Sequence, residues 1–239
     1  RQTAMISVAA IGMTFAITAG QIDLSTGGVT ATSSLLTALM LQRVPMIVAV
    51  LVGLGVGIVF GAVNGIILTK CRIPAFIVTL GTSSVYTGIA RAMTNLEAVS
   101  VTNNTFTHYF GSGNIGFIPT LFLWTIILTL IGQYVYKKTS FGRAVLAVGG
   151  NESSARYSGI NTDRVKFWSM VICGAAAACA GILYAGRMHG ARYTYGENDS
   201  MNIIAAVVIG GTSFSGGKGT VFGTLLGSLV IGMLNNGLL

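Results

Sequence analysis

The chain has 239 residues, of which 14 are basic and 6 are acidic, while 52% are hydrophobic and 33 are glycine. About a quarter of the residues in a soluble globular domain are charged, so this composition excludes an ordinary soluble domain, and the apolar fraction excludes intrinsic disorder. The formal net charge of +8 does not indicate a nucleic-acid partner, because the basic residues lie between apolar stretches, as in a membrane protein with asymmetric loops.

Hydropathy divides the chain into eight apolar segments. In chain order they cover residues 3–20, 24–42, 44–69, 75–93, 119–136, 167–186, 201–214 and 219–239. A helix needs about 20 mostly apolar residues to cross the hydrocarbon core, and a run such as 44–68 is too long and too uniformly apolar for a barrel strand. The sequence therefore predicts an all-α, polytopic transmembrane helix bundle, in which residues 1–239 form a single transmembrane domain with about eight spans.

The loops predict the orientation of the spans. Residues 137–166 hold six basic and two acidic side chains, and the turn with Lys70 and Arg72 falls on the same side, which we expect to be cytoplasmic. The loops 94–118 and 187–200 are polar and rich in turn residues, as expected of an external surface. This orientation puts residue 1 outside, so we expect the chain to be a fragment that lacks one span at each end.

The segment 20–37 is too polar for a lipid-facing helix and carries Asp23 and Ser25 after Gly20. A carboxylate near the bilayer centre costs about 3 kcal/mol, so it needs a partner, and the first amides of a helix restarting after Leu24 are candidates. Two interpretations stay open: Asp23 and Ser25 cap a broken helix, or they border a transport path.

Two further patterns concern glycine. Gly53, Gly57, Gly61 and Gly65 follow a four-residue step, which favours close helix packing in the membrane. Residues 209–221 (IGGTSFSGGKGTV) interrupt the apolar pattern and predict a second broken or re-entrant helix. Their glycines lack the spacing of a phosphate loop, which requires lysine followed by serine or threonine.

The sequence predicts no catalytic or metal site and no cofactor. Its three cysteines have no metal-ligand or redox spacing, and the carboxylates are too scattered to form an acid/base pair. His108 and His189 lie in the external loops without a nucleophile or metal cluster beside them. We therefore expect a protein that is not itself an enzyme.

Five phrases occur together in a fixed order along the whole chain. They are residues 10–15 (AIGMTF) with 20–25 (GQIDLS), 73–82 (IPAFIVTLGT), 141–143 (FGR) with 149–151 (GGN) and 158–160 (SGI), 205–213 (AAVVIGGTS) with 216–217 (GG), and 234–237 (LNNG). In this order they resemble the ribose-type sugar permeases, the membrane subunits of ATP-binding-cassette (ABC) importers for ribose, xylose, galactose, allose and autoinducer-2.

The resemblance implies a permease that forms the translocation path for a sugar or sugar-like solute in the bacterial cytoplasmic (inner) membrane. It implies three partners: a second permease subunit, identical or related, a cytoplasmic ATP-binding subunit that hydrolyses ATP, and an extracytoplasmic sugar-binding protein. Because a neutral sugar needs hydroxyl and amide partners, we expect the path to be lined near Asp23, Ser25, Thr30, Ser33, Asn64 and Thr79.

Within the cytoplasmic loop 137–166, residues 149–160 carry helix start and stop signals. Asn151 is a candidate N-cap, Glu152 suits the positive end of the helix, and Gly159 offers a stop. Together with the small residues Ser154 and Ala155, the resemblance implies a short helix that docks on the ATPase and couples ATP hydrolysis to transport.

An ion-coupled secondary transporter is the main alternative, because broken helices and a buried acid also occur in that class. The basic cytoplasmic loop argues against it. A channel is a weaker alternative, since the segments contain no carbonyl-filter sequence and no repeated charge ring.

Overall fold

The computed structural model describes residues 2–237, which form eleven helices and four two-residue strands. The helices are α1 (Gln2–Thr18), α2 (Thr26–Leu41), α3 (Met46–Cys71), α4 (Ala75–Thr94), α5 (Asn104–Phe110), α6 (Thr120–Lys138), α7 (Ser140–Gly150), α8 (Glu152–Tyr157), α9 (Thr162–Arg187), α10 (Asp199–Ile209) and α11 (Val221–Gly237). Strand β1 (Val99–Ser100) pairs antiparallel with β4 (Gly190–Ala191), and β2 (Asn114–Ile115) pairs antiparallel with β3 (Ile118–Pro119).

Each of the eight apolar segments overlaps one helix over most of its length, so the all-α prediction is confirmed. In order, these are α1, α2, α3, α4, α6, α9, α10 and α11; residues 238–239 of the last segment lie outside the described residues. By length and composition, α3, α6 and α9 are long and apolar enough to cross a membrane.

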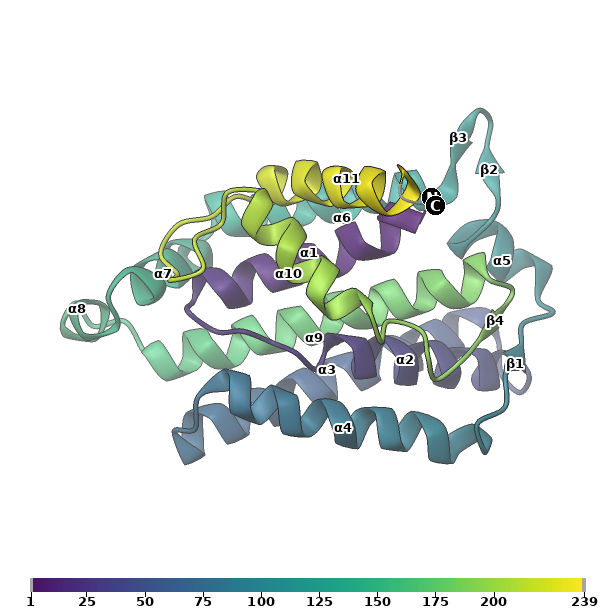
Figure 1. Cartoon of the computed structure of the whole chain (residues 1–239), viewed down its shortest axis with the longest axis horizontal. Helices are drawn as coiled ribbons and strands as arrows, with labels where there is room; N and C mark the ends of the chain where they lie inside the picture. The colour runs from purple at the N-terminus through teal and green to yellow at the C-terminus, as the bar shows by residue number, and fades with distance from the viewer. Residues whose placement is uncertain (1, 238–239) are drawn as a thin grey trace.

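Helix α9 lies at the centre of the bundle and packs against α1, α2 and α3 (Figure 1). Three glycines of the four-residue step in α3 face it: Gly57 and Gly61 both meet Gly174 of α9, and Gly65 meets Phe167, whereas Gly53 meets Thr37 of α2. A Cβ atom at Gly61 would lie only 2.9 Å from the Cα of Val171. The predicted close packing is therefore confirmed, since only glycine at these positions lets the two backbones approach so closely.

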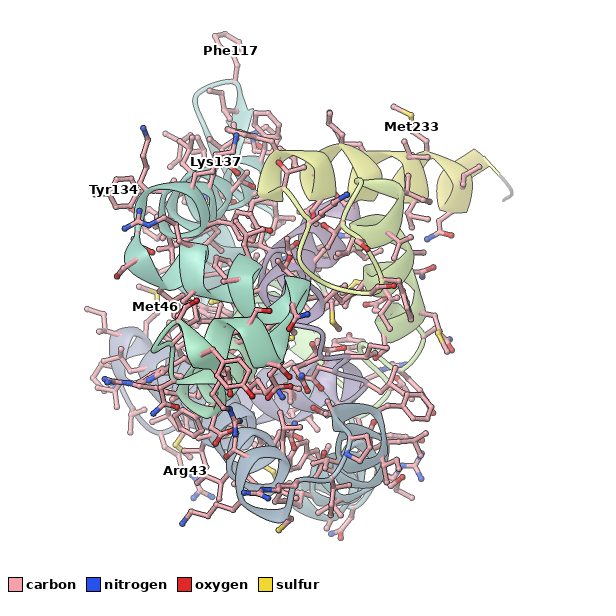
Figure 2. All side chains as sticks on the ribbon, turned by 90° about the vertical axis from the view of Figure 1, so that its left-hand side faces the viewer. Arg43, Met46, Phe117, Tyr134, Lys137 and Met233 are labelled. Atoms are coloured by element: carbon pink, nitrogen blue, oxygen red, sulfur yellow. The ribbon has the colours of Figure 1, made fainter. Side chains whose placement is uncertain are left out.

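Large apolar side chains cover the outside of the bundle. They are exposed along α3, α4, α6 and α11, for example Leu51, Ile77 and Met233, and Figure 2 shows Met233 and Tyr134 pointing away from the bundle. A contiguous apolar exterior of this extent is typical of a surface that faces lipid.

The two groups of loops lie at opposite ends of the bundle. Helices α7 and α8 are at one end, and α5 with the four strands is at the other (Figure 1). Arg72 lines the same cavity as Glu152 and Arg156 of α8, so the α3–α4 turn lies at the α7–α8 end, as the loop charges predicted. Helix α7 itself was not predicted; Thr139 caps it by accepting a hydrogen bond from the Gly142 N–H (3.2 Å).

Both predicted helix breaks are present. The chain is not helical between α1 and α2, where Gly20 has φ of +76°, nor between α10 and α11, where Gly211, Gly216 and Gly217 have positive φ. Helix α10 has 11 residues, which span about 16 Å, roughly half of the ~30 Å hydrocarbon core. It is therefore a half-helix.

Candidate functional site

The break between α1 and α2 is organised by Asp23. Its Oδ1 accepts hydrogen bonds from the Ser25 N–H (2.8 Å) and the Ser25 hydroxyl (2.6 Å), and the side chain is fully buried. The other oxygen, Oδ2, has no hydrogen-bond partner among the described residues. Asp23 thus holds the turn that starts α2, as the capping interpretation expects, whereas Ser25 makes no capping bond of its own.

Two other predicted path residues join this cluster from neighbouring helices. Asn64 of α3 donates to Ser25 Oγ (2.8 Å), and Thr79 of α4 accepts a hydrogen bond from the Leu24 N–H (3.0 Å). The structure therefore brings Asp23, Ser25, Asn64 and Thr79 together around the start of α2, all of them buried.

Thr30 and Ser33 lie farther along α2, where they join it to its neighbours. Thr30 Oγ1 donates to the carbonyl of Ala177 in α9 (3.1 Å). Ser33 Oγ lies 2.9 Å from the Gly53 carbonyl and 3.2 Å from the Ala178 carbonyl. These hydroxyls are buried and bonded to backbone acceptors, so they fix α2 against α3 and α9.

Tyr86 belongs to the same cluster but was missed. Its hydroxyl donates to Asn64 Oδ1 (3.0 Å), and its ring stacks on Phe60 with centroids 3.8 Å apart. A tyrosine in an apolar span needs a partner for its hydroxyl, and this was the signal that could have identified it.

A polar cavity of about 450 Å³ lies beside this cluster, where the first turns of α2 and α10 meet. The Ser200 hydroxyl of α10 accepts a hydrogen bond from the Gly27 N–H of α2 (3.1 Å) and lies 3.1 Å from Thr26 Oγ1. Arg91 and Glu197 form an ion pair of 3.9 Å in the cavity wall, so their charges balance. The remaining lining residues are Leu24, Gly27, Gly28, Ser83, Ser84, Thr87, Gly88, Ser200 and Met201.

The predicted short helix at 149–160 is present as α8. Asn151 Oδ1 accepts a hydrogen bond from the Ser154 N–H (2.8 Å), and Gly159 ends the helix with φ of +83°. Ser154 and Gly159 are exposed, but Ala155 is buried against α7 and α9. The face that α8 presents to the outside therefore holds Ser154 and not Ala155.

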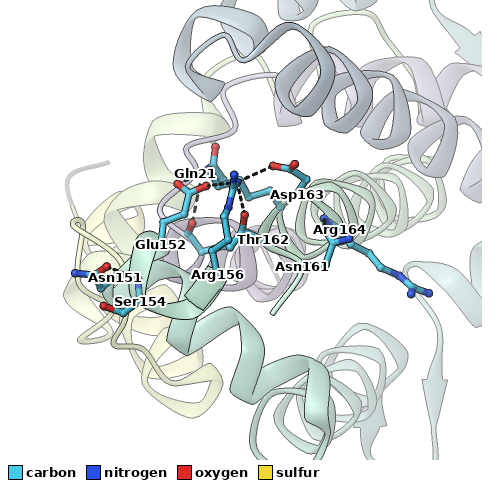
Figure 3. Close-up of polar contacts among 11 residues, drawn as sticks. Gln21, Asn151, Glu152, Ser154, Arg156, Asn161, Thr162, Asp163 and Arg164 are labelled. Atoms are coloured by element: carbon cyan, nitrogen blue, oxygen red, sulfur yellow. Dashed lines mark hydrogen bonds and ion pairs between the residues drawn. The ribbon is translucent and has the colours of Figure 1, made fainter. Parts of the chain in front are cut away.

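A network of charged side chains ties α8 to α9 (Figure 3). Lys166 donates to Glu152 Oε2 at 2.7 Å, and Arg156 lies 3.5 Å from Glu152 and 3.6 Å from Asp163. The hydrogen bond from Lys166 lowers the pKa of Glu152 below its ordinary value, so this carboxylate is ionised at neutral pH. The network holds α8 in one orientation relative to α9.

Comparison with known proteins adds to this geometry. Residues 1–239 match the family described as "Branched-chain amino acid transport system / permease component". The chain belongs to this family. No solved structure matches it.

Three relatives cover essentially the whole chain. The permease is 40% identical over 241 residues to the ribose import permease protein RbsC of Bacillus subtilis (strain 168), across 100% of this chain and 74% of the relative. It is 39% identical over 246 residues to RbsC of Escherichia coli (strain K12), across 100% and 75%. It is 37% identical over 242 residues to the D-allose transport system permease protein AlsC of the same strain, across 99% and 73%.

These matches confirm the resemblance to ABC permeases and favour it over the ion-coupled secondary transporter. The chain is a membrane permease whose role is transport. Within residues 2–237, no group of three or more His, Cys, Asp or Glu side chains is placed to hold a metal ion.

Proposed function

We propose that this permease forms the translocation path for a sugar or sugar-like solute in an ABC importer of the bacterial inner membrane, which it crosses several times. Relatives named for ribose and allose support the substrate class. The partners would be a second permease subunit, identical or related, a cytoplasmic ATP-binding subunit in which ATP is hydrolysed, and an extracytoplasmic sugar-binding protein.

The observation that carries this proposal is the polar cavity where the half-helix α10 meets the first turn of α2. Its hydroxyl groups from Ser83, Ser84, Thr87 and Ser200 suit a neutral polyol, and its one ion pair leaves no net charge. Its volume lies within the range of about 300–1,000 Å³ that small-molecule sites occupy.

The six predicted path residues would act in this scheme from behind the cavity wall. Asp23, Ser25, Asn64 and Thr79 hold the start of α2 in place, and Thr30 and Ser33 hold the helix behind it. The hydroxyl groups that line the cavity must release the sugar in every transport cycle, so we expect them to bind it weakly. Selection among sugars would then reside in the binding protein.

The loop 137–166 would be the cytoplasmic coupling region, with α8 as the helix that docks on the ATPase. Asn151 and Glu152 start this helix, Ala155 anchors it to the bundle, and Ser154 and Gly159 lie on its exposed side. A short helix fixed by an ion-pair network transmits displacement as a rigid body.

Reconstitution tests the proposal. The permease, its ATPase and its binding protein are placed in liposomes, and uptake of labelled ribose or allose is measured with and without internal ATP. We expect uptake that requires ATP and is unchanged by a protonophore. Uptake that requires an ion gradient and proceeds without ATP would instead support a secondary transporter and overturn the proposal.

A further inference from the structure

An open groove of about 960 Å³ lies at the α7–α8 end of the bundle, between α6, α7 and α9. Its walls are mainly apolar and include Val135 of α6, Phe141 and Ala144 of α7, and Ile172 of α9. Trp168 of α9 also lines it, with 45% of its surface exposed. Tryptophan is enriched at the level of the lipid headgroups, where its ring meets both water and hydrocarbon.

A second cavity of about 270 Å³ adjoins this groove, because Val135 and Ile172 line both. It continues between α1, α6 and α9 as far as Cys179, and its walls are almost wholly apolar. From Arg164 to Cys179 the two cavities follow α9 for about 22 Å at 1.5 Å per residue. One leaflet of the hydrocarbon core is about 15 Å thick, so the combined cleft is long enough for an acyl chain.

Two arginines flank the wide end of the cleft. Arg143 of α7 and Arg164 of α9 both line the groove and are exposed, and neither has an ion-pair partner among residues 2–237. Figure 3 shows Arg164 pointing away from the cluster in which Glu152 and Asp163 pair with Arg156 and Lys166. The acids nearest in sequence are therefore engaged elsewhere, and the groove carries two uncompensated positive charges.

We propose that this cleft binds an anionic phospholipid, with its phosphate between Arg143 and Arg164 and an acyl chain in the deeper cavity toward Cys179. Basic pockets between membrane helices on the cytoplasmic side bind anionic headgroups. An ATPase surface would match the arginines but would leave the cavity between α1, α6 and α9 empty, whereas a lipid occupies both parts. The site is separate from the sugar cavity.

Native mass spectrometry of the purified full-length permease tests this. The protein in mild detergent is titrated with phosphatidylglycerol, with phosphatidylethanolamine of the same acyl chains, and with inorganic phosphate. Phosphatidylglycerol should bind most tightly. The double variant Arg143→Gln/Arg164→Gln should weaken it about thirtyfold, equivalent to about 2 kcal/mol at 1.4 kcal/mol per factor of ten.

Two further variants serve as a control outside the cleft and as a test of the deeper cavity. Arg192→Gln removes an exposed arginine of the opposite loop and should leave phosphatidylglycerol binding unchanged. Ala175→Phe narrows the deeper cavity without changing charge and should weaken both lipids. If the double arginine variant binds phosphatidylglycerol as well as the wild type, or if inorganic phosphate competes fully, the proposal is wrong. It is equally wrong if the arginine changes dissociate the ATPase or a second permease copy while lipid binding persists.

Discussion

Replacing Asp23 with alanine should destabilise the break between α1 and α2. The change removes both hydrogen bonds to Ser25 and leaves a buried N–H unpaired. A hydrogen bond to a charged group contributes about 1.5–3 kcal/mol, and an unsatisfied buried donor costs about 1–3 kcal/mol. Removing a buried carboxylate offsets part of this loss, because Oδ2 has no conventional partner among the described residues. We expect a net loss of about 2 kcal/mol, or about 4–8 °C in Tm for a domain of this size.

Thermal unfolding of the purified permease in detergent, followed by circular dichroism, measures this loss. Asp23→Asn keeps an oxygen acceptor for Ser25 and should retain most of the stability and of the sugar uptake. Asp163→Ala removes an exposed acid with a single ion pair of 3.6 Å and should leave Tm unchanged. If Asp23→Asn lost as much stability as Asp23→Ala, charge and not capping would be the function of Asp23. Wild-type Tm in Asp23→Ala would refute the capping argument altogether.

Three further predictions concern packing and coupling. Gly61→Leu should prevent folding of the bundle, because a Cβ there would lie only 2.5 Å from the Met170 carbonyl oxygen of α9. Gly55→Leu has open space and should fold normally; equal yields of folded protein would contradict the close packing. Ser154→Trp on the exposed side of α8 should abolish co-purification of the ATPase and leave Tm unchanged, and a stable complex would exclude docking through that face. Glu152→Lys should reduce sugar-stimulated ATP hydrolysis, and the swap Glu152→Lys/Lys166→Glu should restore part of it, because the swap restores the pair with position 166 but leaves Arg156 beside a lysine; no rescue at all by the swap would show that Glu152 acts in another way.

The sequence predicted the elements whose signals are local. Run length and hydropathy identified eight of the eleven described helices, and the glycines near residue 20 and residues 210–219 marked both breaks. The four-residue glycine step also predicted a close contact, because small residues on one helix face have that effect in membranes. It did not identify α9 as the partner, since the partner depends on the packing of the whole bundle.

The features that could not be predicted depend on contacts between distant residues. Gly27 and Ser200 meet across 173 positions of the chain, and no local pattern indicates that α2 and α10 begin side by side. Ala155 was predicted as a small residue of a docking helix, but its burial against α7 and α9 is visible only once α8 is placed in the bundle.

These contacts form a continuous route from the predicted docking helix to the cavity proposed to bind sugar. Lys166 and Glu152 join α8 to α9, and the hydroxyls of Thr30 and Ser33 join α9 to α2. Because glycines bring α3 against α9 in backbone contact, α2, α3 and α9 are held as one body.

Helix α10, in contrast, packs mainly on α11 and α1, and it meets the start of α2 through the hydroxyl of Ser200. Separating α2 from α10 therefore breaks few contacts, and each neutral hydrogen bond contributes only about 0.5–1.5 kcal/mol. A displacement of α8 that reached α2 through α9 would thus open the cavity at the boundary between α2 and α10, while α1 stays packed on α9. The energy required is small compared with that of unfolding the bundle, as a transport cycle with repeated opening demands.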